Sequence, residues 1–88
     1  MKRVKVFYRR NLGMSPGKLA AQSVHAALGL YQKDPQDHWS CVVLAMSDRK
    51  FDSAKDLHPE GYVVVDAGLT ELTPSTETCL AFYEEEIP

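Results

Sequence analysis

Four short runs, rich in apolar, β-branched and aromatic residues, indicate β-strands along the chain. They cover residues 4–8, 41–46, 62–65 and 78–83, and no charged residue interrupts the last three. Such uninterrupted runs are typical of strands covered on both faces, as in a parallel sheet. We therefore expect an interior sheet whose strands are mainly parallel.

The long segment between the first two runs predicts a helix over residues 16–31. Ser15 is a favourable N-cap, Pro16 suits the first helical position, and the residues that follow are rich in Ala and Leu. Between the second and third runs, only residues 48–60 remain, enough for a short helix around 51–57. The predicted fold class is α/β: a small mixed, mainly parallel four-stranded sheet with one long helix after strand one and a shortened second helical layer.

The length of 88 residues predicts a single domain, residues 1–88. A domain of this size buries only roughly 60 to 65% of the surface of its unfolded chain, so its core is small. With a shortened second helix, one sheet face is expected to be incompletely covered. Exposed apolar patches usually mark interaction sites, so we expect a homodimer; the alternative is that loops of the same chain cover that face.

The composition suggests a soluble, cytoplasmic protein that does not enter a membrane. No apolar run approaches the ~20 residues of a membrane span, and Met1-Lys2-Arg3 leads into a strand rather than into a signal peptide. Cys41 and Cys79 each lie in an apolar run and form no Cys-x-x-Cys pair, which predicts two buried free thiols.

The net charge of -2 conceals an uneven distribution. Residues 1–33 carry seven basic side chains and no acid, whereas residues 34–88 carry all 12 acids and three bases. This asymmetry is compatible with a phosphate-binding surface on the N-terminal third. It is equally compatible with cross-strand pairing between the basic first strand and the acidic residues 84–86.

The predicted helix places three polar side chains in one stripe. At 100° per residue, Lys18, Gln22 and His25 project from the same face. A lysine in the first turn is disfavoured by the helix dipole, so its expected use is anion binding together with the free backbone amides. For His25, two interpretations stay open: a packed side chain bonded to the backbone, or a part of the site.

A second polar segment follows the third strand. Asp66 comes directly after three valines, at the strand end where open α/β sheets usually bind ligands. Gly68 supplies turn freedom, and Thr70 and Thr78 flank the turn, with Thr78 placed to set a hydroxyl beside Asp66. Thr76, like Thr73, also suits a turn or strand role.

These two segments resemble the archaeal and eukaryotic type-two peptidyl-tRNA hydrolases. The resemblance rests on residues 17–22 and 25–29, on Asp66-Ala67-Gly68-x-Thr70, and on Pro74-x-Thr76-x-Thr78, in the family's order. It implies a commonly dimeric α/β domain that hydrolyses the ester joining a peptide to the 3′ end of tRNA, without a metal. The functional lysine of the family falls on Lys18, its aspartate on Asp66, and its threonines on Thr70 and Thr78.

The residues suggest a mechanism for this reaction. Ester hydrolysis needs an oriented water and a donor to the developing oxyanion. We expect Asp66 to orient or deprotonate the water, Lys18 to stabilise negative charge, and Thr70 and Thr78 to position the ester. The predicted substrate-binding residues are Gln22, His25, Thr76, Arg9 and Arg10, with Lys5 beside the two arginines.

No cofactor is expected, and the three histidines lack metal-ligand spacing, so no metal is predicted. The expected partner is peptidyl-tRNA or a related RNA-linked ester. The alternative is a non-catalytic tRNA- or protein-binding module that retains the fold.

The chain departs from the family pattern near the second segment. Leu69 stands where arginine often occurs, and Glu71 where glutamine is frequent; Ser23 and Ser75 replace a common cysteine and glycine. Losing a positive charge at position 69 and gaining a negative one at 71 both weaken the binding of an anionic ligand.

Overall fold

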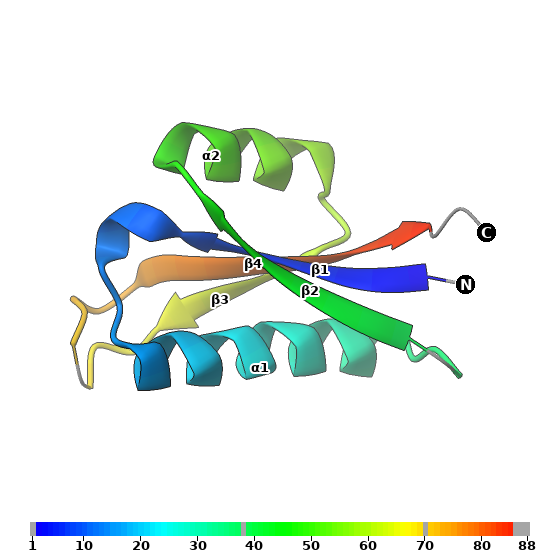
Figure 1. Cartoon of the computed structure of the whole chain (residues 1–88), viewed down its shortest axis with the longest axis horizontal. Coiled ribbons are helices and arrows are strands. Elements are labelled where there is room, and N and C mark those ends of the chain that lie inside the picture. Colours follow the sequence, from blue (N-terminus) through cyan, green and yellow to red (C-terminus); the bar gives the residue numbers. More distant parts are fainter. Residues whose placement is uncertain (1, 38, 70, 86–88) are drawn as a thin grey trace.

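The computed structural model describes residues 2–37, 39–69 and 71–85, in which two helices cover opposite faces of one sheet. In chain order, its elements are β1 (Lys2–Arg9), the 3-10 helix η1 (Arg10–Leu12), α1 (Pro16–Lys33), β2 (Trp39–Met46), α2 (Asp48–Leu57), β3 (Tyr62–Asp66) and β4 (Thr76–Glu85). Figure 1 shows α1 on one side of the strands and α2 on the other. The predicted mixed α/β class with four strands is confirmed.

The strand directions differ from the prediction. The sheet order is β2-β1-β4-β3, and only β1 and β2 are parallel; β4 is antiparallel to both β1 and β3. The prediction of a mainly parallel sheet was therefore wrong. The central strand β4 is covered by α1 on one face and α2 on the other, so its residues 78–83 have the apolar sequence that is usual for parallel strands.

Both helices begin at a serine N-cap. The Ser15 hydroxyl accepts the Lys18 N–H, and the Ser47 hydroxyl accepts the Lys50 N–H. Helix α1 runs two residues beyond its predicted end at Tyr31. Helix α2 begins before its predicted start and has ten residues, so the second layer is a short but complete helix rather than a fragment.

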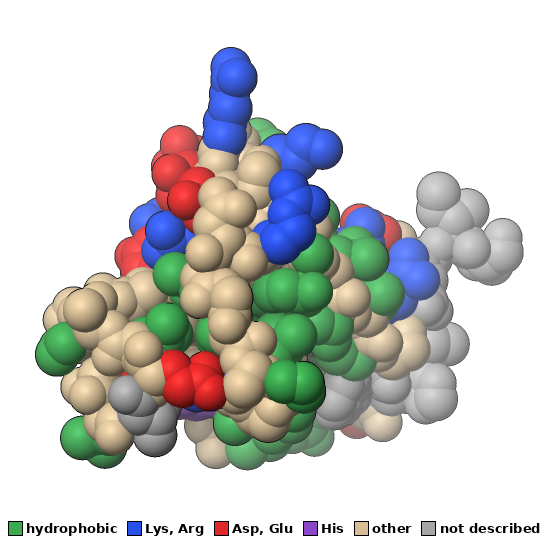
Figure 2. Space-filling model, turned by 60° about the vertical axis from the view of Figure 1, so that its left-hand side comes forward, with side chains coloured by type: hydrophobic (Ala, Val, Ile, Leu, Met, Phe, Trp, Pro, Cys, Tyr) green, Lys and Arg blue, Asp and Glu red, His purple; other side chains and the backbone are tan. Residues whose placement is uncertain are grey.

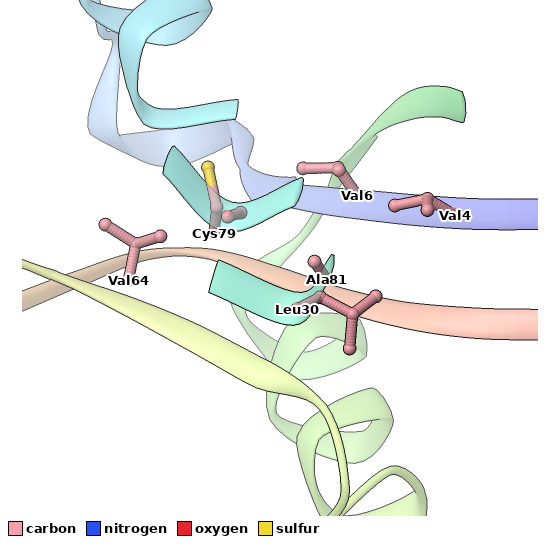
Figure 3. Packing of buried hydrophobic residues seen from close by; sticks show 7 residues of the cluster. Val4, Val6, Leu30, Val64, Cys79 and Ala81 are labelled. Atoms are coloured by element: carbon pink, nitrogen blue, oxygen red, sulfur yellow. The ribbon is translucent and has the colours of Figure 1, made fainter. Parts of the chain in front are cut away.

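The core consists of two clusters, one on each sheet face. The larger lies between α1 and the sheet, and six of its residues are labelled in Figure 3: Val4, Val6, Leu30, Val64, Cys79 and Ala81. The smaller lies under α2 and contains Phe51, Ala54, Leu80 and Phe82. Alternate residues of β4 thus serve opposite clusters, which explains its continuous apolar sequence.

Strand β2 is an edge strand, and this position contradicts two predictions. The Cys41 side chain is exposed, whereas Cys79 is buried, so only one of the two free thiols is buried as expected. Val43 and Leu44 are 42% and 36% exposed. An apolar run predicted burial on both faces, but the outer edge of β2 has no neighbouring strand in the described chain.

The charges of the first strand pair across the sheet. Lys5 Nζ lies 2.7 Å from a carboxylate oxygen of Glu84, and Arg3 lies 3.4 Å from the same side chain. The structure therefore favours cross-strand pairing over a free phosphate-binding surface for this part of the chain. No helix among the described residues has the length and apolar character of a membrane span.

Candidate functional site

The centre of the candidate site is an ion pair between Lys18 and Asp66. Asp66 is the last residue of β3, and Lys18 lies in the first turn of α1, 48 residues away in sequence. Lys18 Nζ lies 2.6 Å from Asp66 Oδ1, and the two side chains are 13% and 4% exposed. The structure thus brings together the two residues that the sequence motifs single out.

Three donors hold the Asp66 carboxylate. Lys18 and, at 3.3 Å, the Gln22 amide donate to Oδ1, while the Gly68 N–H donates to Oδ2 at 2.8 Å. Gly68 has a φ of +80°, and a Cβ there would lie 2.6 Å from Pro74, so only glycine fits. The Lys18 ammonium, followed by the Gly68 N–H, lowers the pKa of Asp66, which stays ionised at neutral pH.

A chain of hydrogen bonds, from Thr78 through Gln22, orients the Asp66 carboxylate from the interior of the protein. The Thr78 hydroxyl donates to Gln22 Oε1 at 2.7 Å, which directs the Gln22 NH₂ group toward Asp66. Thr78 is fully buried and Gln22 is 9% exposed. Thr78 therefore supports Gln22, and through it Asp66, from inside the protein, instead of standing directly beside Asp66 as expected.

A β-bulge turns Thr78 toward α1. Val64 of β3 pairs with Cys79, but the next residue, Val65, pairs with Glu77, so Thr78 is an extra residue in β4. Glu77 reaches Lys55 on the α2 side, whereas Thr78 reaches Gln22 on α1. Bulges commonly redirect a side chain next to a functional site. The alternation of side chains along the strand does not predict this bulge.

Three other predicted site residues have different surroundings. His25 is exposed, and its ring centroid lies 6.1 Å from that of Tyr62, so it is not the packed histidine of the first interpretation. The Thr76 hydroxyl donates to the Thr73 carbonyl at 2.8 Å, which is the turn role. Thr70 lies outside the described residues. Among those that are described, no three His, Cys, Asp or Glu side chains form a metal-binding group.

The basic residues of the first strand do not join this site. Arg9 Nε donates to Asp48 at 3.0 Å, and its Nη1 donates to the Glu77 carbonyl, both on the α2 side. Arg10 lies in η1 with an exposed side chain. Figure 2 shows lysine and arginine side chains gathered over α2, with hydrophobic side chains beneath them. Among the predicted phosphate contacts, Lys5 and Arg9 thus lie on the sheet face opposite α1.

Fold and site together define a small α/β protein whose polar centre is a buried lysine–carboxylate pair at the end of a strand. Residues 3–86 match the model of the family described as "Peptidyl-tRNA hydrolase PTH2". The chain belongs to this family.

Its relatives include proteins from three archaea, each named "Peptidyl-tRNA hydrolase". The protein of Methanopyrus kandleri is 38% identical over an alignment of 100 positions, which covers 93% of this chain and 86% of that protein. Those of Haloquadratum walsbyi and Methanothermobacter thermautotrophicus are 37% and 30% identical, spanning 83% and 91% of this chain and 77% and 82% of their own lengths. The family and these names support an enzyme of the hydrolase class.

Proposed function

We propose that this protein hydrolyses the ester between a peptide, or an N-blocked amino acid, and the 3′ end of tRNA. The observation that carries the proposal is the buried Lys18–Asp66 pair in a member of the peptidyl-tRNA hydrolase family. The reaction requires a water oxygen to bond to the carbonyl carbon while the bond from that carbon to the ribose oxygen breaks. The ribose oxygen then takes a proton.

Asp66 is proposed to orient the attacking water. A carboxylate has about four acceptor positions, and Lys18, Gln22 and Gly68 supply three donors. Counting the donors from the described residues, one position remains for water. The lowered pKa of Asp66 makes it a weak base, so orientation of the water is its main contribution, with proton removal as the ester carbon is attacked.

Lys18 is proposed to stabilise the developing oxyanion. Its ammonium group has three donors, and the bond to Asp66 holds it in place beside the water. A fixed positive charge of this kind can take the role that a metal ion plays in other hydrolases. We therefore propose a metal-independent reaction and expect turnover to continue in the presence of EDTA.

The other residues receive supporting roles. Thr78 and Gln22 position Asp66, because both are buried behind it. His25, one turn further along α1 and exposed, is a substrate contact in this proposal, as is Arg10 in η1. Thr70 keeps its predicted role in positioning the ester. We do not assign a substrate contact to Arg9, which is bonded to Asp48.

Turnover of an N-acetylated aminoacyl-tRNA tests the proposal. We expect Lys18→Ala and Asp66→Asn each to lower kcat/KM by roughly a hundredfold or more. Lys50→Ala and Asp52→Asn, which make the same charge changes on exposed positions of α2, serve as matched controls and should leave it unchanged. Wild-type protein that binds this tRNA without hydrolysing it would instead support the non-catalytic binding module.

We also propose that the protein forms a homodimer through the edge of β2. Strand β2 contains no charged residue, although edge strands are usually protected by charges. Val24 and Leu28 on α1 are 62% and 53% exposed, and with Cys41 and Val43 they line an apolar groove of about 210 Å³. A second copy of this uncharged edge would match both the strand and the groove.

Sedimentation of wild-type protein and of Val43→Lys tests the dimer. The substitution places a charge in the apolar groove between edge strand β2 and α1, so it should yield monomers at concentrations where the wild type is dimeric. Leu57→Lys is the control, because Leu57 is 74% exposed on α2. A monomeric wild type at high concentration would contradict the proposal.

A further inference from the structure

The N-terminus of α1 lacks the carboxylate that a capping box supplies from within the helix. In a capping box, the N-cap serine accepts the N–H of the third helical residue, whose own acidic side chain accepts the serine N–H. Ser15 makes the first of these bonds, to the N–H of Lys18 at 3.3 Å. The third helical residue is Lys18 itself, and an ammonium group cannot accept the second bond.

Glu71 from the β3–β4 loop makes the missing bond. Its Oε2 accepts the Ser15 N–H at 3.2 Å, although the two residues are 56 positions apart in sequence. The bonds from Ser15, with a smaller contribution from the charge of Lys18, lower the pKa of Glu71. The side chain is therefore ionised at neutral pH, and it ties the loop to α1 beside the Lys18–Asp66 pair.

This contact gives the site an unfavourable charge for an RNA ligand. Asp66 is bonded to the Lys18 ammonium group, and Glu71, bonded to the Ser15 N–H, lies close enough for the charge of Lys18 to help lower its pKa, so two carboxylates lie near one ammonium group. An excess of negative charge repels phosphate and weakens its binding. The Glu71 carboxylate thus occupies a position near Lys18 that would otherwise be more favourable to an anion.

The base of the loop is held without Glu71. The Ser75 N–H donates to the Asp66 carbonyl at 2.8 Å, and the Thr76 hydroxyl donates to the Thr73 carbonyl. The Leu69 side chain is 88% exposed. Release of Glu71 from Ser15 therefore breaks this contact of the loop with α1, while the carbonyl and carboxylate contacts of Asp66 stay in place.

We propose that Glu71 is a latch that weakens substrate binding: its carboxylate holds the β3–β4 loop against α1 and is displaced when the 3′ end of an RNA substrate binds. This inference rests on the proposed function for the identity of the ligand. The latch weakens binding of every anionic substrate and leaves the Lys18–Asp66 geometry unchanged. Its removal therefore acts on KM, not on kcat.

The test compares Glu71→Gln and Glu71→Ala with the wild type in two measurements. The first is turnover of N-acetylated aminoacyl-tRNA, and the second is binding of deacylated tRNA, measured by fluorescence anisotropy. Glu71→Gln removes the charge and keeps the shape and an acceptor for Ser15, so it guards against a folding defect. Asp52→Asn on α2 is the control for net charge, because Asp52 is exposed.

We expect both Glu71 variants to lower KM and the dissociation constant roughly two- to fivefold, with kcat unchanged and a smaller difference at high salt. A higher KM in Glu71→Ala, or equal effects of Glu71→Gln and Asp52→Asn, would overturn the latch. If the wild type shows no turnover but Glu71→Gln still binds deacylated tRNA more tightly, the latch stands and the proposed hydrolysis fails. Equal binding by all the proteins would reject the latch on its own.

Discussion

Replacing Thr78 with valine removes a single hydroxyl at nearly constant volume and tests the hydrogen-bond chain behind Asp66. The hydroxyl is fully buried and donates to Gln22 Oε1 at 2.7 Å. Without it, a buried amide oxygen loses its donor, which costs about 1 to 3 kcal/mol of unfolding free energy. The Gln22 amide is then also free to rotate away from Asp66.

The catalytic effect should fall on kcat. Because Thr78 is 0% exposed, it does not touch the substrate, and Thr78→Val should leave KM nearly unchanged. Misplacement of the Asp66 carboxylate should lower kcat roughly ten- to hundredfold. Urea unfolding gives the change in stability, and turnover at temperatures where the variant is fully folded gives kcat and KM.

Two further variants make this experiment specific. Thr78→Ser keeps the hydroxyl and should retain most of kcat. Thr73→Val removes a hydroxyl from an exposed turn and should change the unfolding free energy by less than about 0.5 kcal/mol. An unchanged kcat in folded Thr78→Val would refute the positioning role, and an increase in KM alone would show that the hydroxyl contacts the substrate.

Three other predictions concern stability and substrate binding. A Cβ at Gly29 would lie 2.4 Å from the Tyr62 ring, so Gly29→Ala should lose about 1 to 3 kcal/mol in urea unfolding, and a smaller side chain at Tyr62 should relieve the loss. Arg9→Met breaks the bond to Asp48 and should reduce stability slightly, yet KM for tRNA should stay within about twofold because no phosphate contact is lost. The pKa of Asp66 is lowered on folding, so its contribution to stability is present above about pH 4 and is lost as the pH falls through the lowered value. Acid titration of unfolding should therefore show a steeper loss for the wild type than for Asp66→Asn, and parallel curves would contradict the ion pair.

Local patterns were sufficient to predict the elements of this fold. The position at which α1 begins is set by the local Ser15-Pro16 pair, and all four strands lie where apolar runs occur. Strand direction depends on long-range pairing, which the runs do not encode. Residues 79–82 of β4 are apolar because helices cover both faces of the strand, and that covering is independent of whether the neighbouring strands run parallel or antiparallel.

The sequence pattern did not predict the edge position of β2, for a related reason. An apolar sequence is expected both for a strand that is buried by its own chain and for a strand that is covered by a partner molecule. The exposed side chains of Cys41 and Val43 show that, in the single chain, the outer side of β2 is open. The apolar sequence of this edge is explained if a second copy covers it, as the proposed dimer requires.

Within the site, helical spacing and strand ends predicted which residues lie close together, but not which hydrogen bonds their side chains form. Lys18 and Gln22 face Asp66 as the 100° periodicity requires. Thr78 reaches Gln22 only because a bulge adds one residue to β4, and a bulge is a property of the pairing between two strands.

The contact of Glu71 also depends on long-range structure. Because Lys18 is the third residue of α1, the helix takes its capping carboxylate from a distant loop. Lys18, the proposed catalytic cation, lies at a helix N-terminus, where its charge needs the Asp66 carboxylate and its side chain leaves the Ser15 N–H for Glu71. The polar residues of the two segments therefore depend on one another through Lys18.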